Sequence, residues 1–243
     1  MQQTIVGWFL PRSLEARAIW FDPAHYSWQP VEQKHSGMFL QCPAYQNFSR
    51  NLFVIRSPFD LHLKCELSEA GCELSVGEKS SIRPEQLAAL IKVHPKSEWR
   101  EADKPLLQLM LNYYFLSDHD VDVQYLSPLT TTFFQPTLPG LVLQGRWNIR
   151  NWIRPVNFVF EWWHPSSDLI IKRGQPVLNV MLLPDDLEAK VSLIEAEETE
   201  DVIAMARRVQ NINAYIHNVF SVLPSIIKHR PGRLVRPCKS KSK

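Results

Sequence analysis

The chain has 243 residues, of which 45% are hydrophobic and 21% charged, a composition typical of a soluble globular protein. The net charge of +2 is unevenly distributed, because residues 228–243 hold seven Lys or Arg and no acidic residue. Residues 1–227 therefore carry 20 basic against 25 acidic residues, a net charge of −5, which argues against a nucleic-acid-binding body and leaves only the basic tail for such a contact.

The cysteines and the apolar runs indicate the cellular compartment of the protein. Cys42, Cys65, Cys72 and Cys238 have no metal-ligand spacing. No stretch reaches the roughly eighteen apolar residues of a membrane span, and the N-terminus is too interrupted for a signal peptide. We therefore expect a cytoplasmic protein with free thiols and without a membrane span.

The first part of the chain predicts short strands. Thr4–Leu10 has the length and composition of a strand, whereas the rest of residues 1–35 lacks periodicity and predicts an irregular arm. In Phe59–Glu66 apolar and polar residues alternate, which is the period of a half-buried strand. Gly71 and Gly77, on either side of Cys72–Val76, indicate that this segment is the second strand of a hairpin with Phe59–Glu66. Two further strands are predicted at Met38–Leu40 and Asn51–Ser57.

A short helix and a second series of strands follow. Pro84 and Glu85 suit the first turn of a helix over residues 84–93, which His94-Pro95 would end. Apolar runs separated by turn residues then predict strands at Leu106–Leu116, Asp118–Tyr125, Leu141–Leu143, Asn157–Trp163, Leu169–Ile171 and Val177–Leu183. This series predicts a mainly β domain over residues 1–195, built as a sandwich or a distorted barrel.

A long α-helix is predicted near the end of the chain, over residues 199–223 within a helical region 196–227. Thr199 suits its N-cap, and Pro224 would bend or stop it. Apolar residues recur at alternating spacings of three and four, at Val202, Met205, Val209, Ile212, Ile216, Val219 and Leu223. This seam either packs on the protein's own sheet or joins subunits of a homo-oligomer. Residues 228–243 predict a disordered basic tail that can contact anionic membrane or nucleic acid.

The segment Pro139–Leu183 is the candidate site, because it contains four tryptophans and four arginines. In NFVFEWWH, Glu161 lies on the face opposite Phe158 and Trp162, where a carboxylate needs a cation. It is either a buried ion pair that fixes strand register or an anchor in a pocket lined by Trp147, Trp152 and Trp163; the candidate cations are Arg146, Arg150, Arg154 and Arg173. The candidate ligand-binding residues are Arg146, Trp147, Arg150, Trp152, Arg154, Glu161, Trp163 and His164.

Catalytic and metal-binding patterns are weak. Asp118, Asp120 and Asp122 would share one face of an extended strand, but the glycine and glutamate of a calcium loop are missing, so a solvated strand face is favoured. His119 and His164 lack the spacing of a non-haem iron site. No nucleophile elbow, phosphate loop or dinucleotide motif occurs. We expect no catalytic residue, no metal and no cofactor.

The run PGLVLQGRWNIRNWIRP, followed by NFVFEWW and IKRGQPVLNVML, resembles an uncharacterised protein family of bacteriophages and proteobacteria. The resemblance extends upstream through CPA (Cys42–Ala44), SPFDL (Ser57–Leu61) and SEWR (Ser97–Arg100), and through Tyr114–Asp118. It implies a family member, located in the host cytoplasm or the virion if phage-encoded, and it implies no activity.

The segment Ile171–Pro176, followed by VLNVML, is also similar in pattern to the β-clip fold of dUTPase-like proteins. That resemblance implies a shared fold. The water-activating aspartate of that family would fall near Leu141–Gln144, where no acid stands, and the glycine-rich phosphate arm is absent.

The hypothesis favoured by these patterns is a non-catalytic binding or assembly protein that acts through the Trp/Arg-rich segment. Its partner would be a protein or a small molecule. The alternative is a nucleotide-handling enzyme of dUTPase-like fold or a non-haem metal oxygenase, using Glu161, His164 or Asp118–Asp122. A third hypothesis is a structural component whose subunits join through the C-terminal seam.

Overall fold

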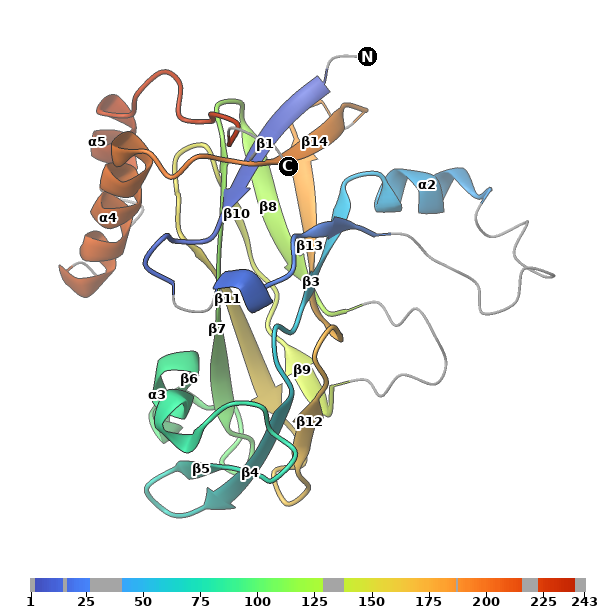
Figure 1. Cartoon of the computed structure of the whole chain (residues 1–243), viewed down its shortest axis with the longest axis vertical. Helices are drawn as coiled ribbons and strands as arrows, with labels where there is room; N and C mark the ends of the chain where they lie inside the picture. The colour runs from blue at the N-terminus through green and yellow to red at the C-terminus, as the bar shows by residue number, and fades with distance from the viewer. Residues whose placement is uncertain are drawn as a thin grey trace.

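The computed structural model describes residues 3–14, 17–26, 41–128, 138–186, 188–215 and 223–238. Within these residues the strands form a six-stranded, a five-stranded and a three-stranded sheet. The sheets curl into a half-barrel around one apolar core to which all three contribute (Figure 1). The predicted mainly β fold is confirmed.

The six-stranded sheet is built around the longest strand, β7, as its strongly apolar sequence suggests. Strand β1 pairs antiparallel with β7 and parallel with β14, and β11 and β6 pair antiparallel with β7. The members of this sheet are β14 (Lys190–Glu195), β1 (Gln3–Phe9), β7 (Leu106–Ser117), β11 (Pro155–Trp162), β9 (Gly140–Val142) and β6 (Ile91–Val93).

Strand β7 bends at Asn112, which has a φ of 57°. Asparagine tolerates this left-handed conformation better than most residues, and its Nδ2 donates a hydrogen bond to the Met110 carbonyl oxygen. The register between β11 and β7 shifts at the same level, as expected for a β-bulge. The bend lets one half of β7 pair with β1 and the other half with β6.

The other two sheets close the core from the opposite side. Aliphatic residues such as Ile55, Val123 and Val180 pack against the six-stranded sheet. The five-stranded sheet has the order β10 (Arg146–Asn148), β8 (Val121–Leu126), β13 (Pro176–Pro184), β3 (Leu52–Arg56) and β2 (Ala24–His25). The three-stranded sheet, at the lower end of Figure 1, has the order β12 (Leu169–Ile171), β4 (Leu61–Leu67) and β5 (Cys72–Val76).

Most predicted strands are found with shifts of a few residues. Cys72–Val76 and Leu169–Ile171 form strands with the predicted bounds. The predicted strand Met38–Leu40 lies outside the described residues. Elements that were not predicted are the strands β2, β6, β10 and β14, the helix α2 (Pro43–Ser49) and the 3-10 turns η1 (Arg17–Ile19) and η3 (Lys96–Glu98).

The helix predicted over residues 84–93 is shorter than expected. A 3-10 turn, η2 (Pro84–Gln86), leads into one α-helical turn, α3 (Leu87–Leu90). The next residues form β6, because Ile91 and Val93 pair with β7 and Ile91 is buried in the core. β-Branched residues suit this pairing, and tertiary contacts override the helical pattern.

The prediction of four free thiols is wrong for two of them. Cys65 and Cys72 form a disulfide across the β4–β5 hairpin, with Cα atoms 6.1 Å apart. The hairpin pairs Leu67 with Cys72 and Cys65 with Leu74, so the two cysteines, seven residues apart, are diagonal neighbours across the two strands. Cys42 and Cys238 are free.

The predicted C-terminal helix is found in part. Helix α4 spans Glu200–Tyr215, a second helix, α5, spans Leu223–Lys228, and residues 216–222 between them lie outside the described part. Val202, Met205 and Val209 are buried within the chain, so this half of the seam packs on the protein's own sheet. These three residues are therefore covered within one chain, and a homo-oligomer joined through the rest of the seam stays a prediction. The side chains of Ile212, Ile216, Val219 and Leu223 are not among those described.

The prediction of a disordered tail from residue 228 is wrong as far as residue 238. Leu234 and Val235 are buried beside α4, and Ala196 and Pro237 form an isolated β-bridge. Asp118, in the turn between β7 and β8, holds this segment. Its carboxylate accepts hydrogen bonds from Arg230 and from the backbone N–H groups of Leu234 and Val235. Residues 229–238 therefore form a strap across the sheet.

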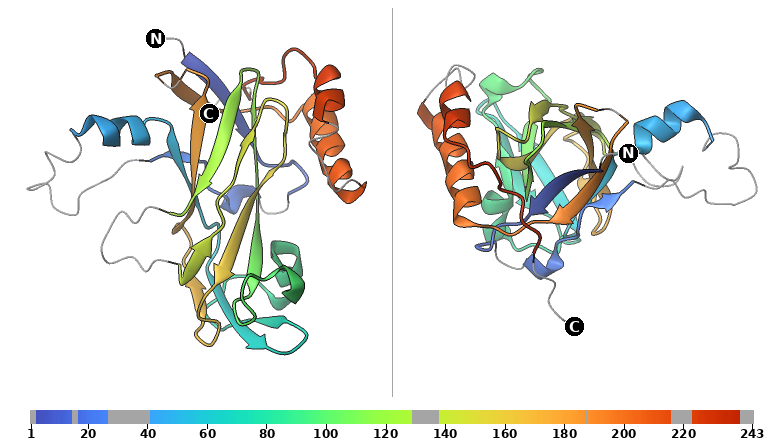
Figure 2. Two further views of the ribbon diagram at one scale, coloured as in Figure 1. Left: turned by 180° about the vertical axis from the view of Figure 1, so that it is seen from behind. Right: turned by 90° about the horizontal axis from the view of Figure 1, so that it is seen from above.

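The helices lie outside the sheets. Figure 2 shows α4 and α5 together on one side and α2 projecting from another. No helix in the described ranges combines the length and the hydropathy needed to cross a membrane.

Candidate functional site

The eight predicted site residues do not form one pocket, because β11 separates them. Arg154 stands immediately before this strand and Trp163 immediately after it. Eight residues of extended chain span about 26 Å at the usual rise per residue. The predicted pocket lined by Trp147, Trp152 and Trp163 is therefore wrong, and the residues divide into one group at each end of β11.

The group at the start of β11 is centred on Arg154. Its guanidinium carbon lies 5.3 Å from the ring centroid of Trp147 and 5.9 Å from that of Trp152, both within the range of cation–π contacts. Tyr125 on β8 meets Trp147 edge-on at 4.5 Å. We call Trp147, Trp152 and Arg154 the Arg154 cluster. All three are half-buried.

The neighbouring arginines differ from Arg154 in being paired with carboxylates. Arg146 Nε donates to Asp122 Oδ2 at 2.8 Å, and Arg150 pairs with Asp120. Arg154 has no carboxylate partner among the described residues. The cluster thus presents one positive charge that no acidic side chain in the described part of the chain neutralises.

The Asp118–Asp122 run is used for ion pairs in the structure. Asp118 lies in the turn rather than on β8, so the three carboxylates do not share one strand face. They pair with Arg230, Arg150 and Arg146, in chain order. In the described ranges no group of three or more His, Cys, Asp or Glu side chains is placed to hold a metal ion.

At the other end of β11, Glu161 is buried, with only 1% of its surface exposed. Its partner is Arg100, in the turn after η3, and not one of the four predicted arginines. Arg100 Nε donates to Oε2 at 3.0 Å and Nη2 donates to Oε1 at 2.8 Å. The hydrogen bonds from Arg100 hold the pKa of Glu161 below its ordinary value against the opposing effect of burial, and the bond from Trp163 adds to them.

Trp163 connects this ion pair to a pocket. Its indole Nε1–H donates to Glu161 Oε1 at 2.7 Å, while 42% of the residue stays exposed. The ring lines an open pocket of about 480 Å³ with His164 and residues of two other segments. We call this the Trp163 pocket; its lining is Cys65, Leu67, Asp103, Trp163, His164, Pro165 and Ser166.

Two histidines that were not singled out as site residues have both ring nitrogens engaged. His62 is buried, with Nε2 2.6 Å from Asp168 Oδ2, and its Nδ1 accepts a hydrogen bond from the Lys79 backbone N–H at 3.2 Å. His94 has its Nδ1 2.7 Å from Glu98 Oε2 and its Nε2 3.3 Å from Gln108 Oε1. These contacts hold loops against the sheets and leave neither ring free to act on a ligand.

Comparisons with protein-family models, with curated proteins and with solved structures found no match to this chain. The functional argument therefore rests on the geometry of the Arg154 cluster and the Trp163 pocket.

Proposed function

We propose that this protein is a non-catalytic binding protein whose partner docks on the Arg154 cluster. The observation that carries the proposal is the guanidinium of Arg154, which is held against two indole rings and pairs with no carboxylate of the described residues. Neighbouring Arg146 and Arg150 are paired with Asp122 and Asp120, so the free charge is confined to one position.

The residue types also favour a macromolecular partner. Tryptophan, tyrosine and arginine are the side chains most enriched among energetically dominant interface residues. Here Trp147, Trp152, Arg154 and Tyr125 gather at β10, which is an edge strand of the five-stranded sheet. Half-buried rings lose little conformational entropy when a partner covers them.

The chemistry of the cluster favours one class of partner, a protein segment with a carboxylate next to an aromatic or apolar side chain. The carboxylate would pair with the Arg154 guanidinium, and the apolar group would cover the exposed parts of the two indoles. Because residues 1–227 carry a net charge of −5, a polyanion such as nucleic acid would be repelled over most of the surface.

The test is a selection from a random peptide library on immobilised protein, with excess Arg154→Gln variant in solution as competitor. Glutamine keeps a side chain over the two rings and removes the charge. We expect peptides that contain Asp or Glu beside an aromatic residue, and a dissociation constant about 10- to 100-fold weaker for the variant, as for one lost charge-assisted hydrogen bond.

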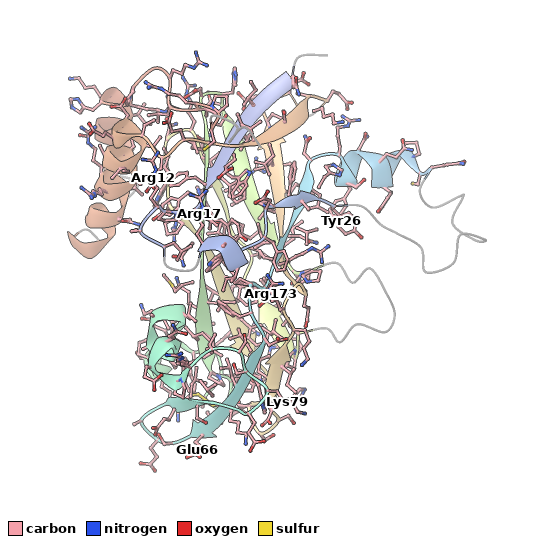
Figure 3. The ribbon with its side chains drawn as sticks, in the orientation of Figure 1. Arg12, Arg17, Tyr26, Glu66, Lys79 and Arg173 are labelled. Carbon is pink, nitrogen blue, oxygen red and sulfur yellow. A yellow bond between two sulfur atoms is a disulfide. The ribbon has the colours of Figure 1, made fainter. Side chains whose placement is uncertain are left out.

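Arg173→Gln is the matched control, because Arg173 (labelled in Figure 3) also stacks on an aromatic ring, Phe21, at 4.5 Å, but its partners, Phe21, Asp60 and Ile19, are not residues of the Arg154 cluster. This variant should bind the selected peptides as the unmodified protein does. Failure to enrich any peptide over the Arg154→Gln competitor would overturn the proposal, as would equal affinity of the two proteins.

A further inference from the structure

The Trp163 pocket contains a large aromatic side chain that is both exposed and fixed. An exposed indole is usually free to rotate, but the Nε1–H of Trp163 is tied to Glu161 at 2.7 Å. Glu161 is itself buried and is held by two hydrogen bonds from Arg100. A carboxylate is costly to bury, so this arrangement needs compensating contacts. Its result is a tryptophan ring held in one orientation at the wall of a pocket.

Such a ring is a pre-organised platform for a ligand. Ordering a side chain on binding costs binding free energy, and a ring already held in place avoids that cost. The pocket volume of about 480 Å³ lies in the range of small-molecule sites. Three parts of the chain meet there, namely the β4–β5 hairpin, the turn that contains Asp103 and the residues after β11. Figure 3 marks this hairpin at the lower end of the molecule by Glu66.

The lining specifies what the ligand has to offer. Asp103 supplies two acceptor oxygens, while the His164 ring and the Ser166 hydroxyl can each donate and accept hydrogen bonds. Leu67 and Pro165 add apolar surface around the indole. A ligand with neighbouring hydroxyl groups, each both donor and acceptor, can hydrogen-bond with these three polar side chains. An apolar C–H face of the same ligand can pack against the indole ring.

Charge argues against an ionic ligand. Arg100 pairs with Glu161 and Lys104 with Glu101, while Lys96 Nζ, near the rim, donates to the Ser68 carbonyl oxygen at 3.1 Å, and the lining itself contains no Lys or Arg. For a cation, Asp103 is the single acidic residue in the lining. A neutral ligand needs neither a cationic side chain nor a second carboxylate in the lining.

We propose that the Trp163 pocket binds a neutral saccharide, with the C–H face of one sugar ring against the Trp163 indole. Hydroxyl groups of that ring donate to Asp103 and exchange hydrogen bonds with His164 and Ser166. Glu161 and Arg100 are positioning residues that fix the indole and do not touch the sugar. This site is independent of the Arg154 cluster, at the opposite end of β11.

The first experiment screens the full chain on an array of neutral oligosaccharides built from glucose, galactose, mannose and N-acetylglucosamine, with sialylated and amino-sugar probes included. Hits are then measured by saturation-transfer NMR and by tryptophan fluorescence. We expect binding to at least one neutral oligosaccharide and weaker binding to charged analogues. Absence of any neutral hit, or a preference for the cationic or anionic probes, would overturn the proposal.

The second experiment uses variants against the best oligosaccharide. Trp163→Ala should weaken binding at least tenfold and abolish the fluorescence change, and Asp103→Asn should weaken it because asparagine lacks one of the two acceptor oxygens. Trp152→Ala, in the Arg154 cluster, is the matched control and should bind unchanged.

Glu161→Gln tests positioning. It should weaken binding, and the NMR signal of the Trp163 indole N–H should shift and broaden as the ring loses its anchor. A Trp163→Phe variant keeps a flat ring that has no indole N–H to anchor, and it should bind the oligosaccharide more tightly than Trp163→Ala does. Equal affinity of Trp163→Ala and the unmodified protein would place the sugar elsewhere and refute the inference.

Discussion

The strap at residues 229–238 depends on one carboxylate, and its removal is the most informative perturbation of the fold. Asp118 accepts from Arg230 at 2.9 Å, from the Leu234 N–H at 2.8 Å and from the Val235 N–H at 3.0 Å. In Asp118→Ala the Arg230 guanidinium, only 5% exposed, keeps its bonds to carbonyl oxygens of Arg150 and Ser117 but loses its counter-charge.

The expected magnitude follows from burial. Removal of one partner of a buried ion pair costs about 3–5 kcal/mol, because the other charge is left uncompensated. The Asp118 side chain is 20% exposed, which favours the lower end of that range. For a chain of this size 1 kcal/mol corresponds to roughly 2–4 °C, so calorimetry should record a melting temperature lower by about 6–12 °C.

The pH dependence gives a second, independent readout. Burial alone would raise the pKa of Asp118, but the hydrogen bonds from Leu234, Arg230 and Val235 outweigh it and lower the pKa below its ordinary value. A lowered pKa in the folded state means stability that is complete above the unfolded-state pKa of about 3.9 and is lost as the pH falls through the folded-state value. The stability difference between the unmodified protein and Asp118→Asn should therefore be constant near pH 7 and shrink below about pH 4.

The control is Asp120→Asn, which breaks the exposed pair with Arg150 and should cost less than about 1 kcal/mol. Hydrogen exchange at the Leu234 and Val235 amides should accelerate in Asp118→Ala and stay unchanged in Asp120→Asn. A loss below 1 kcal/mol in Asp118→Ala, or a difference that does not change with pH, would refute the account of the strap.

Two further predictions concern packing. Gly140→Ala should lower stability by about 1–3 kcal/mol, because a Cβ there would lie 1.9 Å from the Glu161 carbonyl oxygen; Gly145→Ala, with no atom within 4 Å, should be nearly neutral in the same melts. Val202→Asp should cost more than about 3 kcal/mol and leave the particle mass in light scattering unchanged. Ala204→Asp, at an exposed position of the same helix, should change neither the stability nor the particle mass. An oligomer that dissociates in Val202→Asp with unchanged melting temperature would contradict the packing of α4 on its own sheet.

The strands that could be predicted are those whose own residues carry the pattern. β7 is apolar along its length, and Phe158, Phe160 and Trp162 of β11 alternate toward the core as expected. β10 has only three residues, Arg146–Asn148, of which Trp147 alone favours strands, and it is a strand because β8 pairs with it. Pairing of this kind is a property of the tertiary structure and leaves no local pattern.

The same distinction applies to the candidate sites. Glu161 and Trp163 lie two residues apart at the end of β11, so their proximity is visible in the sequence. Arg100, 61 residues from Glu161, lies in an exposed turn without a distinctive motif, and only the fold brings the two together. The error of a single pocket arose because residues close in sequence were assumed to be close in space, whereas an extended strand carries its two ends far apart.

The position of β1 has a consequence for synthesis on the ribosome. Its residues pair with β7 on one edge, through contacts such as Val6 with Ser117, and with β14 on the other, from Gln3–Lys190 to Trp8–Glu195. At roughly 5–20 residues per second, the first strand waits about 10–40 s before its second neighbour has been translated. Until then its outer edge is open to other chains. Nascent chains stalled before residue 190 should therefore bind chaperones, and the six-stranded sheet should be complete only once Lys190–Glu195 has left the ribosome.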